Sequence, residues 1–309
     1  MRILFACGGT AGHINPAIAI ANYLKDKDPS TEVLFAGNPN GMEAKIVPKA
    51  GYDFKPIRVL GIQRHLSARN IKNNIKALWY LAGSSAKAKK IIDDFKPDIV
   101  MGCGGYVSGP VVRKAARDFY NVGDRICLLS FGGSLGAQRL NEAVADLMAW
   151  HLKERDFVHI HGSGSYYGPS YYFDLLKEKG IDASKHNNLI IREYINDMPR
   201  CLAAADLVIS RCGAITLAEI EAAGKASVLI PSPNVSENHQ YHNAMVLANH
   251  GAAVVIEEKD LTGESLCEAV KKLTDDPEAI ERLSANAKTL AVQDANERIR
   301  KEIIELYQR

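Results

Sequence analysis

Two short apolar runs in this chain each end in a Gly-Gly-hydroxyl-x-Gly loop that leads into a helical pattern. The first run, residues 2–7, is followed by the loop 8–12, and the second, residues 126–131, is followed by the loop 132–136. Glycines at such a turn let backbone N–H groups approach a ligand, and the helix start adds the positive end of its dipole. One such loop is a weak signal, because any tight turn uses glycine. Two of them in corresponding positions of two half-chains predict a pair of nucleotide-binding domains that face one cleft.

Short β-rich runs alternate with helical patterns along most of the chain, which predicts an α/β fold with parallel sheets. A chain of 309 residues favours two domains, here 1–122 and 123–309, with a linker near 120–124. The expected strands are 2–7, 32–37, 54–59, 98–102, 126–131, 157–161, 188–192, 206–210, 226–231 and 253–257. The expected helices are 13–26, 40–50, 69–94, 108–119, 136–153, 170–180, 196–205, 214–224, 238–250, 263–275, 277–292 and 296–308.

Composition excludes several classes of protein. A net charge of +2 argues against nucleic acid as a partner, because wrapping phosphates requires a concentrated basic face. Six scattered cysteines without a Cys-x-x-Cys pair are typical of reduced thiols in the cytoplasm, rather than of a disulfide framework or a zinc site. The N-terminus reads as a core strand, which leaves no room for a signal peptide, and no apolar run approaches the ~20 residues of a membrane span. A protein that is soluble, or bound to a membrane only at its surface, is expected.

The segment 210–219 runs from a predicted strand end into a helix and is a candidate anion site. Backbone N–H groups near Ala214 and Thr216 can hold phosphate oxygens there. Glu219 lies one turn further on, where a carboxylate can accept hydrogen bonds from both hydroxyls of a ribose. The alternative is that Glu219 only interacts favourably with the helix dipole.

Two other segments lie at predicted carboxyl ends of strands, where open α/β sheets bind ligands. Residues 236–243 gather amide and imidazole side chains at a helix start, and they either contact a sugar or form a solvated loop. The glycine-rich loop 102–110 either lets a substrate approach the backbone or is only a tight turn.

His13 and the segment 64–80 each allow a functional and a structural interpretation. His13 lies at the start of the first helix, where the dipole disfavours an imidazolium, so a neutral ring could accept a proton near pH 7. Most single histidines are structural, however. The segment 64–80 mixes cations with Ile71, Ile75 and Trp79 at helical spacing, which suits an anionic membrane surface. An ordinary core-facing helix with solvated lysines is the alternative.

Taken together, these segments resemble the MurG family, whose members transfer N-acetylglucosamine to lipid I in peptidoglycan synthesis. The matching motifs are Gly-Gly-Thr-Ala-Gly-His-Ile-Asn-Pro-Ala at 8–17, Gly-Gly-Tyr-Val-Ser-Gly-Pro at 104–110, Gly-Gly-Ser-Leu-Gly-Ala-Gln at 132–138, Arg-Cys-Gly-Ala-Ile-Thr-Leu-Ala-Glu at 211–219 and Asn-His-Gln-Tyr-His-Asn-Ala at 238–244. Their order and spacing match over nearly the whole chain, which makes the resemblance specific.

The resemblance implies two Rossmann-like, doubly wound parallel-sheet domains in the GT-B arrangement, with the first domain shortened and the last helix able to pack back on it. It implies an inverting, metal-independent transferase without a cofactor, which moves N-acetylglucosamine from UDP-GlcNAc to the 4-hydroxyl of lipid I and so forms lipid II. The expected location is cytoplasmic, peripheral on the inner face of the bacterial plasma membrane. The expected partners are the two substrates, the anionic membrane surface and other cell-wall synthesis proteins.

Site residues carry over from the family pattern by position. His13 is the candidate base. The acceptor side takes Thr10, Gly12 and Tyr106. Ile195 is placed against the uracil, Glu219 on the ribose, and Gln240 near the sugar. The full donor-binding set is Ser134, Ile195, Ala214, Ile215, Thr216, Leu217, Glu219, His239, Gln240 and Asn243.

The chain departs from the family pattern in two places. Ala11 stands where the family usually has glycine. After Gly109 only one helix and a turn precede the strand at 126, whereas family members insert further strand and helix units there. The lost part includes a His-Glu-Gln-Asn loop that reaches the donor sugar and a basic residue near the phosphates. Two alternatives therefore stay open: a catalytically impaired UDP-sugar-binding paralogue, and another UDP-GlcNAc enzyme of the same fold, such as a 2-epimerase.

Overall fold

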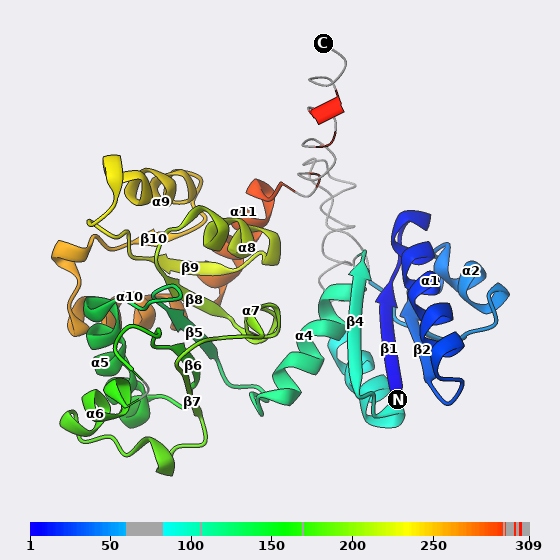
Figure 1. Ribbon diagram of the computed structural model, residues 1–309, viewed down its shortest axis with the longest axis horizontal. Coiled ribbons are helices and arrows are strands. Elements are labelled where there is room, and N and C mark those ends of the chain that lie inside the picture. The colour runs from blue at the N-terminus through cyan, green and yellow to red at the C-terminus, as the bar shows by residue number, and fades with distance from the viewer. Residues whose placement is uncertain are drawn as a thin grey trace. The chain divides into compact units, whose positions relative to one another are not determined.

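The computed structural model describes residues 1–59, 83–105, 107–168 and 170–292, together with residues 294, 300, 303 and 304. The chain divides into two compact units, Met1–Asn121 and Val122–Arg309 (Figure 1). Four sequence predictions fall wholly or partly outside the described residues: the basic segment 64–80, residues 69–82 of the expected helix 69–94, Tyr106, and nearly all of the last expected helix, 296–308.

The first unit is built on a parallel sheet that has four strands in its described part. These are β1 (Arg2–Cys7), β2 (Glu32–Gly37), β3 (Asp53–Pro56) and β4 (Ile99–Gly104), in the order β3-β2-β1-β4. The helices are α1 (Ala11–Lys27), α2 (Glu43–Lys49) and α4 (Ser108–Phe119), and residues 83–95 are also helical.

Alternation along β1 explains why helices cover both faces of this sheet. Phe5 and its neighbours on one face pack with α1 and α2 in one apolar cluster. Leu4 and its neighbours on the other face pack with α4 and the helical residues 83–95. A strand that is buried on both faces must be apolar throughout, as a central parallel strand requires.

The second unit is built on a parallel sheet of six strands among its described residues. These are β5 (Cys127–Phe131), β6 (Val158–Gly162), β7 (Leu189–Arg192), β8 (Leu207–Ser210), β9 (Ala226–Leu229) and β10 (Val254–Val255), in the order β10-β9-β8-β5-β6-β7. The helices are α5 (Gln138–Glu154), α6 (Tyr171–Glu178), α7 (Met198–Ala204), α8 (Ala214–Ala223), α9 (His239–Asn249), α10 (Gly263–Thr274) and α11 (Pro277–Leu290). Single 3-10 turns are η1 (Ala183–Lys185), η2 (Ser236–Asn238) and η3 (Glu258–Asp260).

The strand order positions the functional loops. In an open α/β sheet, ligands bind outside the carboxyl ends of the strands, where the order reverses. That reversal lies between β1 and β4 in the first unit and between β5 and β8 in the second. The two glycine loops, 8–12 and 132–136, follow β1 and β5, so each loop lies beside the reversal point of its own sheet.

The α/β fold with two parallel-sheet units is confirmed, and the boundary differences have local causes. The predicted helix 40–50 begins only at Glu43, because residues 38–41 form a turn closed by a 2.9 Å bond from Gly41 N–H to Asn38 O. The predicted strand 253–257 shrinks to Val254–Val255, which pairs with β9 at the edge of the sheet. Short edge strands are a common way to limit pairing with other chains.

A chain of buried polar side chains crosses the core of the second unit. His159 Nε2 and His161 Nδ1 each lie 2.8 Å from Ser130 Oγ, and His151 Nε2 lies 3.2 Å from His159 Nδ1. All three histidines are fully buried. Burial lowers the pKa of His151 to about 4 and that of His161 to about 3, while burial and the two neighbouring rings hold the pKa of His159 well below 6.5. These rings are therefore neutral in the folded protein at pH 7.

Candidate active site

The glycine loop after β5 is hydrogen-bonded to the loop that follows β6. Ser165 donates to Ser134 O from both its N–H, at 3.0 Å, and its Oγ, at 3.1 Å. Tyr166 N–H donates to Leu135 O at 3.2 Å. The carbonyl oxygens of Ser134 and Leu135 thus face the loop after β6, and the side chain of Ser134 is exposed. Because Ala137 at the N-cap of α5 supplies no capping side chain, the first N–H groups of α5 remain available to a ligand.

The start of α8 offers the same kind of uncapped N-terminus. Gly213 is its N-cap residue and provides no side-chain cap. Ala214 and Ile215 are exposed in its first turn, whereas Leu217 is buried and its N–H donates to Gly213 O at 3.0 Å. Glu219 is exposed one turn beyond Ile215. The segment therefore presents both N–H groups and a carboxylate at the surface of the second unit.

Two amide side chains tie the start of α9 to the loop after β8. Gln240 Oε1 accepts from Cys212 N–H at 3.1 Å and from Ser232 N–H at 3.0 Å. Asn243 Nδ2 donates to Cys212 O at 3.3 Å. Burial raises the pKa of the Cys212 thiol to about 12, so this residue contributes its peptide groups rather than a thiolate.

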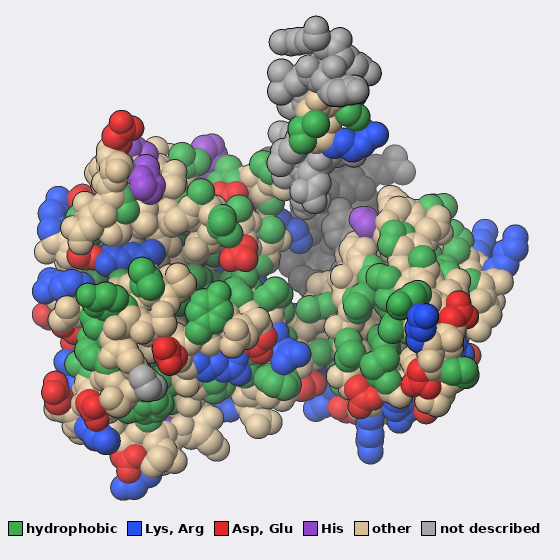
Figure 2. All heavy atoms as spheres, in the orientation of Figure 1, with side chains coloured by type: hydrophobic (Ala, Val, Ile, Leu, Met, Phe, Trp, Pro, Cys, Tyr) green, Lys and Arg blue, Asp and Glu red, His purple; other side chains and the backbone are tan. Residues whose placement is uncertain are grey.

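His239 opens α9 on the surface. Its side chain is exposed, and its Nδ1 donates to Ser236 O at 2.9 Å. Figure 2 shows histidine side chains at the edge of the second unit that carries α9. The four predicted residues Gln240, Asn243, His239 and Thr216 therefore come from two adjacent helix starts.

Sequence reasoning did not single out Arg211 and Glu258, which form an ion pair with side chains only 13% and 16% exposed. Arg211 Nη1 also donates to the carbonyl oxygens of Ile230, at 3.3 Å, and Pro231, at 3.2 Å. The guanidinium thus holds the ends of β8 and β9 and the turn η3 together. In the sequence, the only indication of this pair is that Arg211 lies at the end of a predicted strand. Its partner Glu258 is 47 residues away along the chain.

These elements enclose a cavity of about 480 Å³ at the carboxyl end of the second sheet, within the size range of small-molecule sites. Thr216 and Gln240 are the predicted residues that line it. Its full lining is Gly132, Gly133, Gly136, Ala137, Gln138, Arg139, Tyr167, Arg211, Gly213, Thr216, Ser232, Asn234, Gln240 and Glu258. Ile195 is buried with its side chain against Gly162, and the roles predicted for it and for Ser134 and Glu219 stay predictions.

In the first unit, His13 lies half-buried against the glycine loop after β1. Its Nδ1 is 3.0 Å from Gly8 O and 3.4 Å from Thr10 Oγ1. The ring packs directly on Gly104, where an added Cβ would lie 2.6 Å from His13 Cδ2. Thr10 and Gly12 are at the exposed or half-exposed start of α1, and Thr10 makes no side-chain cap. Thr10, Gly12 and His13 are therefore close together, whereas Tyr106 is outside the described residues.

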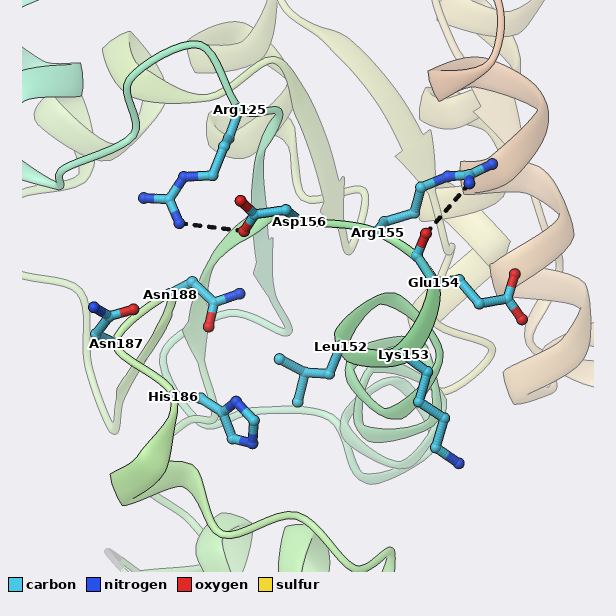
Figure 3. A pocket seen from close by; sticks show the side chains of 9 residues that line it. All are labelled: Arg125, Leu152, Lys153, Glu154, Arg155, Asp156, His186, Asn187 and Asn188. Atoms are coloured by element: carbon cyan, nitrogen blue, oxygen red, sulfur yellow. Dashed lines mark hydrogen bonds and ion pairs between the residues drawn. The ribbon is translucent and has the colours of Figure 1, made fainter.

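A second depression of about 440 Å³ lies at the opposite, amino edge of the second sheet (Figure 3). Its charged groups are largely paired: Arg125 with Asp156 at 3.3 Å, and Arg155 with Asp275 at 2.9 Å. It lacks a glycine loop or a helix start, and ligands of open α/β sheets bind at the other edge. We assign it no role.

Acidic and basic side chains are mixed over the face of the described residues shown in Figure 2. Within the described ranges, no helix combines the length and apolar character that a bilayer crossing needs. In the same ranges, no three His, Cys, Asp or Glu side chains converge as metal ligands would.

Known protein families match both units. The glycosyltransferase family 28 N-terminal domain matches residues 3–122, and the glycosyltransferase family 28 C-terminal domain matches residues 127–299. The crystal structure of MurG from Acinetobacter baumannii has a TM-score of 0.52 at 23% identity, covering 98% of this chain and 99% of that one. Two parallel-sheet units with these matches define a GT-B-like glycosyltransferase.

Curated relatives narrow this class. The UDP-N-acetylglucosamine–N-acetylmuramyl-(pentapeptide) pyrophosphoryl-undecaprenol N-acetylglucosamine transferase of Acetivibrio thermocellus is 35% identical, over 97% of this chain and 96% of that relative. The transferase of the same name from Lactococcus lactis subsp. lactis is also 35% identical, over 97% of this chain and 98% of its own length. The chain belongs to the MurG family.

The alignment with the Acetivibrio relative shows a deletion in this chain. The alignment spans 365 positions, which exceeds the 309 residues of this chain by 56. At least that many positions of the alignment therefore hold no residue of this chain.

Proposed function

We propose that this protein transfers N-acetylglucosamine from UDP-GlcNAc to the 4-hydroxyl of the N-acetylmuramyl group of lipid I, with inversion at the anomeric carbon. The names of the curated relatives support the reaction. The observation in the structure that carries the proposal is the cavity at the reversal point of the second sheet, which a glycine loop, an uncapped helix start and a fixed amide side chain enclose.

The second unit suits the donor nucleotide. A diphosphate placed at the starts of α5 and α8 would meet free N–H groups and the positive ends of two helix dipoles. Arg139 lines the same cavity and adds a cation there. The leaving diphosphate would be stabilised by groups that are already oriented, which is the most effective form of electrostatic catalysis. Glu219 would bind the ribose, Ile195 the uracil, and Gln240 with His239 and Asn243 the sugar.

The first unit supplies the base. The oxygen of the acceptor 4-hydroxyl forms a bond to the anomeric carbon while the bond from that carbon to the UDP oxygen breaks. The hydroxyl proton passes to Nε2 of His13, and the bonding electron pair leaves with UDP. Thr10, Gly12 and Tyr106 are proposed to line the acceptor side.

Replacing Glu219 with alanine is expected to weaken UDP binding by about 1.5–3 kcal/mol, the range for hydrogen bonds to a charged group. Isothermal titration calorimetry with UDP measures the change. Glu221→Ala is the matched control, because this carboxylate lies on the same helix but about 200° around it. Equal weakening in both variants, or none in Glu219→Ala, would remove Glu219 from the donor site.

A second candidate function is a UDP-sugar-binding protein that turns over slowly or not at all. The deletion of at least 56 alignment positions favours it, since lost chain can remove a wall of the acceptor or donor site. Catalysis depends on near-attack geometry, and a displacement of ~1 Å can lower the rate 10²-fold. Transfer of labelled N-acetylglucosamine to a lipid I analogue, measured beside UDP affinity, separates the two functions.

We further propose that the protein binds the anionic inner face of the bacterial plasma membrane through the segment 64–80. This rests on its sequence alone, in which cations accompany Ile71, Ile75, Leu78 and Trp79. Basic residues near such a surface contribute ~1 kcal/mol each.

Vesicle sedimentation tests this proposal. Binding to vesicles that contain anionic lipid should fall with added salt and in Trp79→Ala, whereas Trp150→Ala, which changes a partly buried residue of α5, should bind as the unmodified protein does. Equal binding to neutral and anionic vesicles would contradict the electrostatic part.

A further inference from the structure

Glu43 is a buried carboxylate that the proposed mechanism does not use. Its side chain is 1% exposed. It accepts from Asn38 N–H at 2.8 Å and from Gly9 N–H at 3.2 Å. Charged side chains are rarely buried in this way unless they are paired or bonded to polar groups. Here the partners belong to the loop that follows β2 and to the glycine loop that carries the acceptor-side residues.

The backbone around this carboxylate leaves room for it only because the neighbouring residues Gly8 and Gly41 have no side chain. A Cβ added at Gly8 would lie 2.1 Å from Glu43 Oε1, and one added at Gly41 would lie 2.3 Å from Oε2. The charge of Glu43 also affects the neighbouring Cys7. Burial, Cys103 and Glu43 together raise the pKa of the Cys7 thiol to about 12. Two loops thus close around one charged group.

The contact to Gly9 and the contact to His13 involve a single peptide group. Gly9 N–H and Gly8 C=O belong to the same peptide bond, so Glu43 binds its N–H end while His13 Nδ1 lies 3.0 Å from its oxygen. A carbonyl oxygen can only accept, so Nδ1 of His13 carries the hydrogen. The lone pair of the neutral ring is then on Nε2, the atom that the proposed reaction protonates.

We propose that Glu43 is a positioning residue for His13, acting through the Gly8–Gly9 peptide as a carboxylate–peptide–imidazole relay. When His13 takes a proton at Nε2, positive charge develops at the C=O end of this peptide while a carboxylate is held at its N–H end. Hydrogen bonds in such a chain polarise one another. The relay fixes the tautomer of His13. Its carboxylate also offsets the positive end of the dipole of α1, since the first turn of that helix holds no acidic residue. It rests on the role proposed for His13.

The tautomer of His13 can be measured without any turnover. In imidazole ¹⁵N NMR spectra of the full chain, the His13 resonances are assigned by their loss in His13→Gln. We expect a single Nδ1–H tautomer in the unmodified protein and a mixture of tautomers in Glu43→Gln, which is neutral and replaces one of the two accepting carboxylate oxygens with an –NH₂ group. Glu43→Asp, which retains the charge, should lie between them. Glu32→Gln changes an exposed carboxylate of β2 and is the control.

The kinetic readout is the transfer reaction. Glu43→Gln should lower kcat by about 10- to 100-fold, as loss of a partner that orients a catalytic group does, with little change in the KM for UDP-GlcNAc, because the donor site is in the other unit. Glu43→Asp should restore part of kcat. Circular dichroism and thermal melting establish that each variant is folded.

The outcomes separate this proposal from the proposed function. A folded Glu43→Gln variant with a pure Nδ1–H tautomer would overturn the relay. So would a Glu43→Asp variant that is no more active than Glu43→Gln in a chain that does transfer sugar. If the tautomer changes as expected but the unmodified protein transfers no sugar, the relay stands and the transferase function fails.

Discussion

Replacing His13 with alanine is expected to lower the rate of N-acetylglucosamine transfer by about 10²- to 10⁴-fold, the usual contribution of a general base. The reason is that Nδ1 is committed to Gly8 O, so Nε2 is the atom left to take the acceptor proton. UDP affinity should not change, because the cavity assigned to the nucleotide lies wholly within the second unit. Transfer of labelled sugar to a lipid I analogue and calorimetry with UDP measure the two quantities.

His250→Ala provides the control for this experiment. His250 is exposed, and its Nδ1 makes the same kind of contact, 2.7 Å from Val246 O, at the end of α9. Its replacement should leave the rate unchanged. Turnover that survives His13→Ala would remove His13 from the mechanism. Tight UDP binding without transfer in the unmodified protein would instead establish the second candidate, a UDP-sugar-binding protein that does not support the reaction.

The free energy of unfolding of the second unit is expected to fall steeply as the pH drops from 7 to 5. His151, His159 and His161 have a lowered pKa in the folded protein, chiefly through burial. Above their unfolded value of about 6.5, neither state binds the proton and the full stability is present. Below it, the unfolded chain takes up protons that the folded core excludes, so stability is lost progressively towards the folded pKa values of about 4 and 3.

The expected loss is about 2 kcal/mol per buried histidine between pH 7 and pH 5, since each pH unit is worth about 1.4 kcal/mol once the unfolded residue is charged. Urea unfolding at several pH values measures it. In His151→Gln the free energy of unfolding should fall between pH 7 and pH 5 by about 2 kcal/mol less than in the unmodified protein. His242→Gln, which changes an exposed residue of α9, should not alter the pH dependence. A profile of unchanged steepness in His151→Gln would show that His151 is not the source.

Local patterns predicted most of this fold. The strands that enter the two glycine loops are continuous apolar runs, and their glycines mark the turns, so β1, β5 and the helices after them could be predicted closely. The predicted helix 40–50 began three residues too early, although Asn38-Pro39 and Asn40-Gly41 are dipeptides that mark turns. The strand predicted at 253–257 exists as β10, but its reduction to two residues could not be predicted, because edge pairing depends on which strand lies beside it.

The site was partly predictable for the same reason. Glycine loops and helix starts are local, so the segments around Ser134, Thr216 and Gln240 could be identified from the chain alone. Glu43 could not, because it lies in an ordinary short helix and meets Gly9 across 34 residues. The partner of Arg211 was hidden for the same reason, since pairing over such separations is decided by packing rather than by sequence pattern.

The hydrogen bonds that hold the Gln240 side chain limit which groups a molecule bound in the cavity can place beside it. A free glutamine amide presents a donor on one side and an acceptor on the other, and a half-turn of its last torsion exchanges them. Here both backbone N–H contacts fall on Oε1, so the amide has one orientation, and its –NH₂ group is the part left to contact a molecule in the cavity that Gln240 lines. A bound molecule must offer a lone pair at that point. An analogue with a hydrogen in place of an oxygen there would leave a polar group unmatched, and the site would discriminate against it.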